Sequence, residues 1–294
     1  MIEQALYEHL QEQDDLLPFL ATYGNKMAIF NQEAPADTDP GWATGPQYGR
    51  IVFYVNLQGD PARTMGGTLS VDILCKEDEQ FPEDIEPILR NLVHGYFFSR
   101  DTFVVSAQWH NSTPFTEPTN KVTGCTVTFD LLAFPISDYA PHVIAQFNEW
   151  SSTIDGLYII NHDKLLTAAW KPSGGKSAVY WRAAREEPAS WIRSTFATEF
   201  FSATVKGYIF SESTAKAAEV ANDLKIRLYA IKRLKKDGVL LRAGESPIIV
   251  NRKNIVDNGA DPLRVGQLTV EATYGVIIHY ESGEQIRYIN YPRL

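Results

Sequence analysis

The spacing of apolar residues predicts alternating helices and strands in the first half of the chain. Apolar side chains recur at helical spacing over residues 2–20 and 83–97, with acidic residues between them, so both segments are predicted amphipathic helices. Over residues 68–75, apolar and other side chains alternate with a period of two, which is typical of a half-buried strand. Shorter apolar runs predict further strands at residues 27–30, 51–57, 102–109 and 125–134.

The second half repeats this order of predicted elements. Its helices are predicted over residues 142–154 and 214–234, and an alternating strand over residues 202–211. Shorter strands are predicted at residues 157–160, 165–170, 178–182, 248–250 and 267–279, with a turn at 172–175. The repeated order predicts an internal duplication. The alternative is that any α+β chain with variable loops can be laid over itself.

Three pairs of segments carry the alignment of the two halves. They are residues 52–54 with 179–181, the alternating positions of 69–73 with those of 205–209, and residues 126–127 with 269–270. We therefore expect an α+β fold of two similar domains, each a mostly antiparallel sheet flanked by helices. The boundary is placed in the proline-containing segment 135–141, which gives domains of residues 1–137 and 138–294.

Composition and charge narrow the class of protein. The chain has 294 residues, of which 44% are hydrophobic, and this excludes a disordered protein. Its net charge of -9 argues against a protein that wraps duplex DNA. The charge is uneven along the chain. Residues 1–137 carry 7 basic and 19 acidic side chains, whereas residues 138–294 carry 20 basic and 17 acidic ones. Since the sequence shows neither a membrane-spanning apolar run nor a signal-peptide pattern, we expect synthesis in a cytoplasm.

The common signatures of catalysis and cofactor binding are absent from the sequence. The six histidines lack metal-site spacing, and no GxSxG or GxGxxG motif is present. Cys75 and Cys125 are expected to be small buried residues rather than a disulfide or metal ligands. The segment Gly174-Gly175-Lys176-Ser177 resembles part of a P-loop, but Trp170 occupies the position of its first glycine, so a turn is predicted. We expect no enzyme activity and no catalytic, cofactor-binding or metal-binding residue.

Two groups of residues are candidate interaction surfaces. The first is a basic run at the predicted end of the second long helix, consisting of Lys225, Arg227, Lys232, Arg233, Lys235 and Lys236. These charges could simply complement the helix C-terminus, or they could contact a phosphate backbone or the acidic first half of a neighbouring copy. The second group is Trp42 and Tyr48, in one of the Pro-, Asn-, Asp- and Gly-rich loops predicted at residues 37–49, 111–121 and 252–263.

The order of elements in the first half resembles that of the tail terminator, or tail completion, proteins of long-tailed bacteriophages. The resemblance is one of pattern. It rests on residues 2–6 (IEQAL), 46–50 (PQYGR), 66–68 (GGT), the helix at 83–97 and a final strand ending in DLL at 130–132. It covers about 130 residues and, through the repeat, extends more weakly into the second half.

The resemblance implies a ring, usually a hexamer, that caps the tail tube and joins it to the head in the neck region. The implied partners are other copies of the chain, the tail-tube protein, neck or connector proteins, and DNA that passes through the ring without specific binding. The implied location is the virion, without a membrane, after synthesis in the host bacterial cytoplasm. Members of the family commonly have one such domain, so the doubled chain leaves a ring of six copies or of three open. Two alternatives remain: another neck, tail-tube or baseplate component, and a soluble enzyme whose site is built from distant residues.

Overall fold

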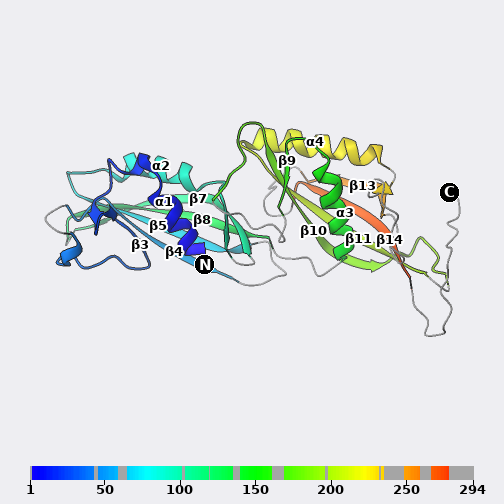
Figure 1. Ribbon diagram of the computed structural model, residues 1–294, viewed down its shortest axis with the longest axis horizontal. Coiled ribbons are helices and arrows are strands. Elements are labelled where there is room, and N and C mark those ends of the chain that lie inside the picture. Colours follow the sequence, from blue (N-terminus) through cyan, green and yellow to red (C-terminus); the bar gives the residue numbers. More distant parts are fainter. Residues whose placement is uncertain are drawn as a thin grey trace.

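A computed structural model describes residues 2–42, 46–58, 65–100, 103–118, 120–134, 140–160, 169–195, 198–231, 233–234, 248–258 and 266–277. These residues form two six-stranded sheets that lie end to end, with helices on one face of each sheet (Figure 1). The α+β class predicted from the sequence is confirmed. None of the helices in the described segments is long and apolar enough to cross a membrane.

The first sheet contains the elements of the first half of the chain. The helices are α1 (Ile2–Gln11) and α2 (Pro82–Val93), and the strands are β3 (Ile29–Asn31), β4 (Arg50–Leu57), β5 (Met65–Lys76), β6 (Phe97–Arg100), β7 (Phe103–Glu117) and β8 (Val122–Ala133). The strand order is β3-β4-β5-β8-β7-β6, and every pair is antiparallel except β3 with β4. Smaller elements precede β4, namely the 3-10 turns η1 (Asp14–Leu16) and η2 (Pro40–Trp42) and the short strands β1 (Thr22–Tyr23) and β2 (Lys26–Met27).

The second sheet contains the elements of the second half. The helices are α3 (Pro141–Ser152) and α4 (Thr214–Ala230), and the strands are β9 (Leu157–Ile159), β10 (Ser177–Pro188), β11 (Thr198–Phe210), β12 (Arg233–Leu234), β13 (Ile248–Asp257) and β14 (Leu268–Ile277). The strand order is β9-β10-β11-β14-β13-β12, and only β9 and β10 are parallel. This is the topology of the first sheet, element by element, so the same fold occurs twice in the chain. We call the two copies the first unit and the second unit.

The facing of side chains can be compared between β4 and β10. Phe53 pairs with Val71 in the first sheet and Trp181 pairs with Gly207 in the second, and both large rings face the helices. Tyr180, which the sequence alignment matched with Phe53, belongs instead to the cluster on the opposite face. The alignment of these two strands therefore does not agree with the structure, because neighbouring residues of a strand point to opposite faces of the sheet.

Each unit has its own core between its sheet and its helices. In α2, Pro82 begins the helix, and Ile85, Leu89 and Val93 lie on the buried face at helical spacing. In α4, the side chain of Ser213 accepts a hydrogen bond from the backbone amide of Lys216 and so caps the helix. The buried face of α4 is made by Ala217, Ala221, Leu224 and Leu228.

A third apolar cluster joins the two units through their helix-free faces. Its members are Phe97, Val104, Leu132, Phe134, Ile160, Ala178, Tyr180, Tyr208 and Phe210, with Trp170 packed against them. The backbone amide of Phe97 donates to the carbonyl of Trp170 at 2.6 Å, and the amide of Trp170 donates back at 3.0 Å. The units therefore share a core. The predicted boundary at residues 135–141 lies outside the described residues except for Ala140 and Pro141, and the division at residue 137 stays a prediction.

Several predicted boundaries differ from the structure. The helix predicted over residues 2–20 ends at Gln11, and the one over 214–234 ends at Ala230. The helix over 83–97 ends at Val93, and Phe97 begins β6. Most of the loop predicted at 111–121 is strand, because β7 extends to Glu117, and of the loop predicted at 252–263 the described part is strand up to Asp257, the end of β13. Of the strand predicted at 165–170, residues 165–168 lie outside the described part.

Candidate interaction surfaces

The two cysteines are buried and poorly reactive. Burial raises the pKa of the Cys75 thiol to about 12, with the nearby carboxylates of Glu83 and Asp84 adding to the effect. Burial also raises the pKa of the Cys125 thiol. Both thiols therefore stay protonated at neutral pH and are poor nucleophiles. Within the described segments, no group of three His, Cys, Asp or Glu side chains could hold a metal ion.

The segment that resembles part of a P-loop forms a turn before a strand. Gly174 and Gly175 adopt left-handed backbone angles, and Ser177 begins β10. The Ser177 hydroxyl lies 2.6 Å from that of Ser211 and is thereby engaged within the fold. A phosphate cradle needs the glycine loop to open a helix, so this segment does not provide one.

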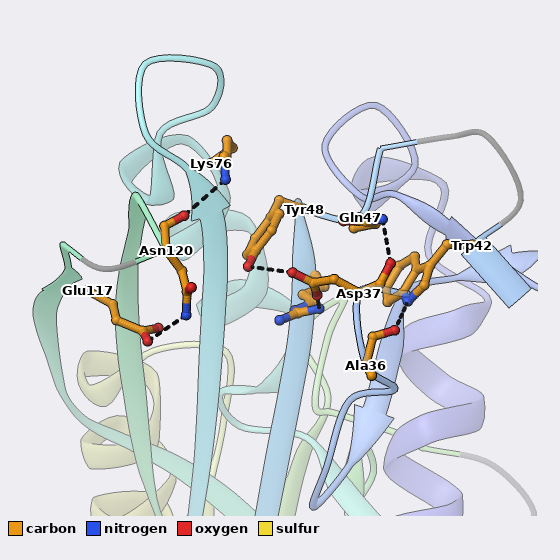
Figure 2. A network of polar contacts seen from close by, with 9 residues as sticks. Ala36, Asp37, Trp42, Gln47, Tyr48, Lys76, Glu117 and Asn120 are labelled. Carbon is orange, nitrogen blue, oxygen red and sulfur yellow. Dashed lines mark hydrogen bonds and ion pairs between the residues drawn. The ribbon is translucent and has the colours of Figure 1, made fainter. Parts of the chain in front are cut away.

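A polar network covers the free end of β4 and β5 in the first unit (Figure 2). We call it the Tyr48 surface and define it by Asp37, Gln47, Tyr48, Arg50 and Lys76. Asp37 is its centre: its carboxylate accepts from the Tyr48 hydroxyl at 3.1 Å and from Arg50 at 2.8 Å, and its backbone carbonyl accepts from Gln47 at 2.6 Å. These contacts bind the loop before β4 to the strand itself.

The ring of Tyr48 lies between two cations. The Arg50 guanidinium is 4.6 Å from the ring centroid, and the Lys76 ammonium is 5.1 Å from it. Burial raises the pKa of the Tyr48 hydroxyl, and the negative charge of Asp37 raises it further. Tyr48 therefore stays neutral and donates a hydrogen bond from its hydroxyl to the Asp37 carboxylate. Its side chain is half-buried, so part of the ring is accessible to a partner.

Lys76 connects the Tyr48 surface to the turn between β7 and β8. Its ammonium donates to the backbone carbonyl of Asn120 at 2.9 Å, and the Asn120 amide donates to the Glu117 carboxylate at 2.8 Å (Figure 2). The exposed acidic turn Glu77, Asp78 and Glu79 follows directly after Lys76. The free end of the first unit therefore combines a cation-flanked aromatic ring with an acidic rim.

Trp42 does not belong to the exposed part of this end. Its side chain is 2% exposed and packs in a small cluster with Ala21 and Ala28, against Tyr23 and Phe30. Its indole N–H donates to the backbone carbonyl of Ala36 at 3.0 Å (Figure 2). The expectation that Trp42 contacts a partner does not agree with this burial, because the side chain is used to hold the loop in place.

The basic run is divided between different elements. Lys225 and Arg227 lie on α4 and form ion pairs with Asp257 at 3.1 Å and Asp223 at 2.7 Å. Arg233 lies beyond the helix, in β12 at the outer edge of the second sheet. Lys232, Lys235 and Lys236 lie outside the described residues. That these residues form one interaction surface therefore stays a prediction.

One groove was not expected from the sequence. A volume of about 590 Å³ lies beside the start of α2 and the exposed edge of β7, and Glu83, Glu86, Ser112 and Phe115 are among its lining residues. The Ser112 hydroxyl donates to the Glu86 carboxylate at 2.6 Å. The groove could not be predicted because the composition of residues 111–121 is that of a loop, whereas pairing with β8 makes most of them a strand.

Comparisons with family models, curated proteins and solved structures found no match to this chain.

Proposed function

We propose that this chain is a virion structural protein, a tail terminator of the neck region whose copies form a ring at the end of the tail tube. The observation that carries the proposal is the arrangement of the two units. The two units share one topology, but they contact each other through different strands. The first unit uses β6, β7 and β8, and the second uses β10 and β11. Such a head-to-tail contact, repeated between subunits, generates a ring if the rotation closes.

The charge distribution supports this proposal. The first half carries an excess of 12 acidic side chains and the second half an excess of 3 basic ones. Opposite charges at the two ends of a subunit steer successive copies into one order and suppress pairing of like ends. An acidic surface also repels DNA, so a ring with acidic residues along its bore would let DNA pass without binding it.

The proposed partners are other copies of this chain, the tail-tube protein on one side of the ring, and neck or connector proteins on the other. The proposed location is the tail or neck of the virion. None of these interactions requires a catalytic group, and the first-unit thiols described above stay protonated and buried.

The proposal is tested by the mass of the purified chain in solution, measured by light scattering, together with negative-stain images of the same sample. Closed rings with a fixed number of copies, three or six, would support it. A chain that stays monomeric up to its solubility limit at low salt, or one that grows into open filaments, would contradict it, because neither can cap a tube with a closed ring.

A further inference from the structure

The outer part of β7 has one edge without a strand partner in the described part of the chain. On this side, β6 covers residues 103–106, and backbone bonds to the segment just before β6 cover Ala107. The amide of Trp109 donates to Nδ1 of His94 at 3.0 Å. Among the described strands, β8 alone pairs with residues 111–117. Their other edge is therefore open to a further strand.

Pro114 indicates which backbone groups face this open edge. In an antiparallel pair, successive residues bond alternately to one neighbouring strand and to the other. Proline has no N–H to donate, so its place opposite Cys125 fits a position whose backbone faces away from β8. The register is regular over residues 111–117, so Ser112 and Thr116 face away from β8 as well. Both residues can therefore bond to an incoming strand through N–H and C=O, and Pro114 through its C=O.

The groove of about 590 Å³ lies beside the same residues. Its lining includes Ser112, Pro114 and Thr116 of β7 and Pro82, Glu83 and Glu86 of α2. The strand partners of Ser112 and Pro114 in β8 belong to the core between the sheet and the helices, so these two side chains lie on the face that α2 covers. A strand added at this edge would therefore project every second side chain into the groove.

The groove is acidic. Glu83 is exposed, and Glu86 accepts a hydrogen bond from Ser112 at 2.6 Å while its ion pair with Arg90 is long, at 3.7 Å. Burial raises the pKa of the Cys125 thiol in the groove wall, and the charges of Glu86 and Glu83 add to the effect. None of the described lining residues is basic. The groove therefore attracts a cationic side chain and repels a carboxylate or a phosphate.

An exposed tryptophan lies next to the groove on the same strand. The side chain of Trp109 is 40% exposed, and the Arg90 guanidinium is 4.9 Å from its ring centroid. The indole N–H donates to the Ser112 hydroxyl at 3.0 Å, which connects the ring to the groove. Tryptophan and arginine are enriched where proteins contact one another. This favours a protein segment over a small cation as the occupant.

We infer that the open edge of β7 binds an extended segment of a partner protein that carries Lys or Arg at alternate positions. The segment adds a strand to the first sheet through the backbone of Ser112 and Thr116, and its basic side chains enter the groove toward Glu83 and Glu86. A second copy of this chain bound by the same edge is disfavoured, because it would bring two acidic grooves together. The site lies within one chain, so the inference goes beyond the proposed ring and does not depend on it.

Peptide binding to the full-length chain tests the inference. The probe is a labelled decapeptide in which lysine alternates with threonine, and the same peptide with glutamate in place of lysine is its control. Fluorescence anisotropy should show saturable binding of the lysine peptide alone. Glu83→Lys with Glu86→Lys should weaken this binding by at least about tenfold, because it places like charges in the groove. Glu219→Lys with Asp223→Lys on α4 adds the same charge outside the groove and should change the affinity far less.

Amide hydrogen exchange of the wild-type chain separates strand addition from simple charge attraction. With the lysine peptide bound, exchange over residues 111–117 should slow, because Ser112 and Thr116 then donate to the added strand. Saturable binding that the groove variant weakens, together with this protection, supports the inference. The absence of saturable binding, equal weakening by the groove and control variants, or binding without protection of residues 111–117 overturns it. Unfolding curves establish that the substitutions act on binding and not on folding, and none of these results depends on ring formation.

Discussion

The β4–β5 end of the first unit and the β10–β11 end of the second have the same backbone arrangement and different chemistry. In the second unit, Tyr180, Tyr208 and Phe210 are almost fully buried in the cluster that joins the units. In the first unit, the same place carries Arg50, which pairs with Asp37 at 2.8 Å. The shared topology places the two ends alike, whereas the side chains decide whether such an end becomes a buried apolar core or a polar surface.

The interior of the two units shows a second contrast, in the distribution of volume. Phe53 faces Val71 under the helices of the first unit, and Trp181 faces Gly207 under those of the second. A β-carbon on Gly207 would lie 2.5 Å from the Trp181 ring. The larger ring of the second unit is thus accommodated by the missing side chain of its strand partner. The Trp181 indole N–H also needs a partner and donates to the Ser151 hydroxyl at 2.7 Å.

The largest effect is expected from breaking the cluster between the units. Phe134→Ala should lower the free energy of unfolding by about 3–5 kcal/mol, as is typical of a buried Phe. Phe134 is 2% exposed, and its ring lies 5.0 Å from that of Tyr180 and 5.5 Å from that of Phe210. Urea unfolding measures the change. Phe81→Ala is the control, because Phe81 is 58% exposed and should cost within about 0.5 kcal/mol. Equal losses for the two variants would show that the cluster does not hold the units together.

The second-largest effect is expected from substituting the glycines that precede the corresponding strands β4 and β10, and the loss of stability should differ between them. Gly49 and Gly174 have φ angles of +61° and +60°, so alanine is strained at both. At Gly49 a β-carbon would also lie 2.0 Å from the backbone carbonyl of Phe19, whereas at Gly174 it would meet nothing within 4 Å. We expect Gly49→Ala to cost roughly 2–4 kcal/mol and Gly174→Ala about 1 kcal/mol. Thermal or urea unfolding distinguishes them, and a larger loss at Gly174 would contradict the close packing of the loop before β4.

The counterpart relation in the interior can be tested by exchanging volume. Gly207→Val, which introduces the residue that the first unit has at position 71, should destabilise the chain by about 1–3 kcal/mol through overpacking against Trp181. Adding Trp181→Phe supplies the rest of the first unit's pair and should recover part of the loss. A double variant whose unfolding free energy is the simple sum of the two single losses would mean that these positions are not coupled.

The smallest effect is a pH dependence confined to the first unit. His9 of α1 is buried against Tyr96 and Phe98, and burial lowers its pKa from the ordinary value of 6.5. Just below pH 6.5 the unfolded chain therefore binds a proton at His9 that the folded chain does not bind. The stabilisation that comes from a buried, neutral His9 is lost as the pH falls through 6.5.

Urea unfolding of the wild-type chain and of His9→Gln at pH 7.5 and 5.5 measures this dependence. The wild-type chain should lose more stability than the variant between the two pH values, because glutamine does not titrate. A parallel loss in both would assign the pH dependence to other groups.

Elements with one clearly buried face could be predicted from the sequence, and edge elements could not. The alternation around Val71 and the helical spacing around Ile85 identified β5 and α2, because burial on one face imposes a period. β6 was missed because Phe97 continues the apolar pattern of the preceding helix, and only its pairing with Ser106 and Trp170 makes it a strand. The outer parts of β7 and β13 are polar edge strands, and their composition is that of a loop.

The candidate surfaces were predictable only in part. Tyr48 does lie at an accessible end of the fold, but Trp42 from the same loop is buried, and loop composition does not distinguish the two. Arg233 was grouped with a helix, since nothing local in the sequence marks where α4 ends and β12 begins.

Sedimentation of the wild-type chain at low and at high salt tests most directly whether copies associate through oppositely charged ends. We predict a closed oligomer of fixed size at low salt that dissociates toward the 33.1 kDa chain as salt is raised, because exposed charge pairs are screened. A monomer at both salt concentrations, or an oligomer whose mass does not respond to salt, would contradict the account.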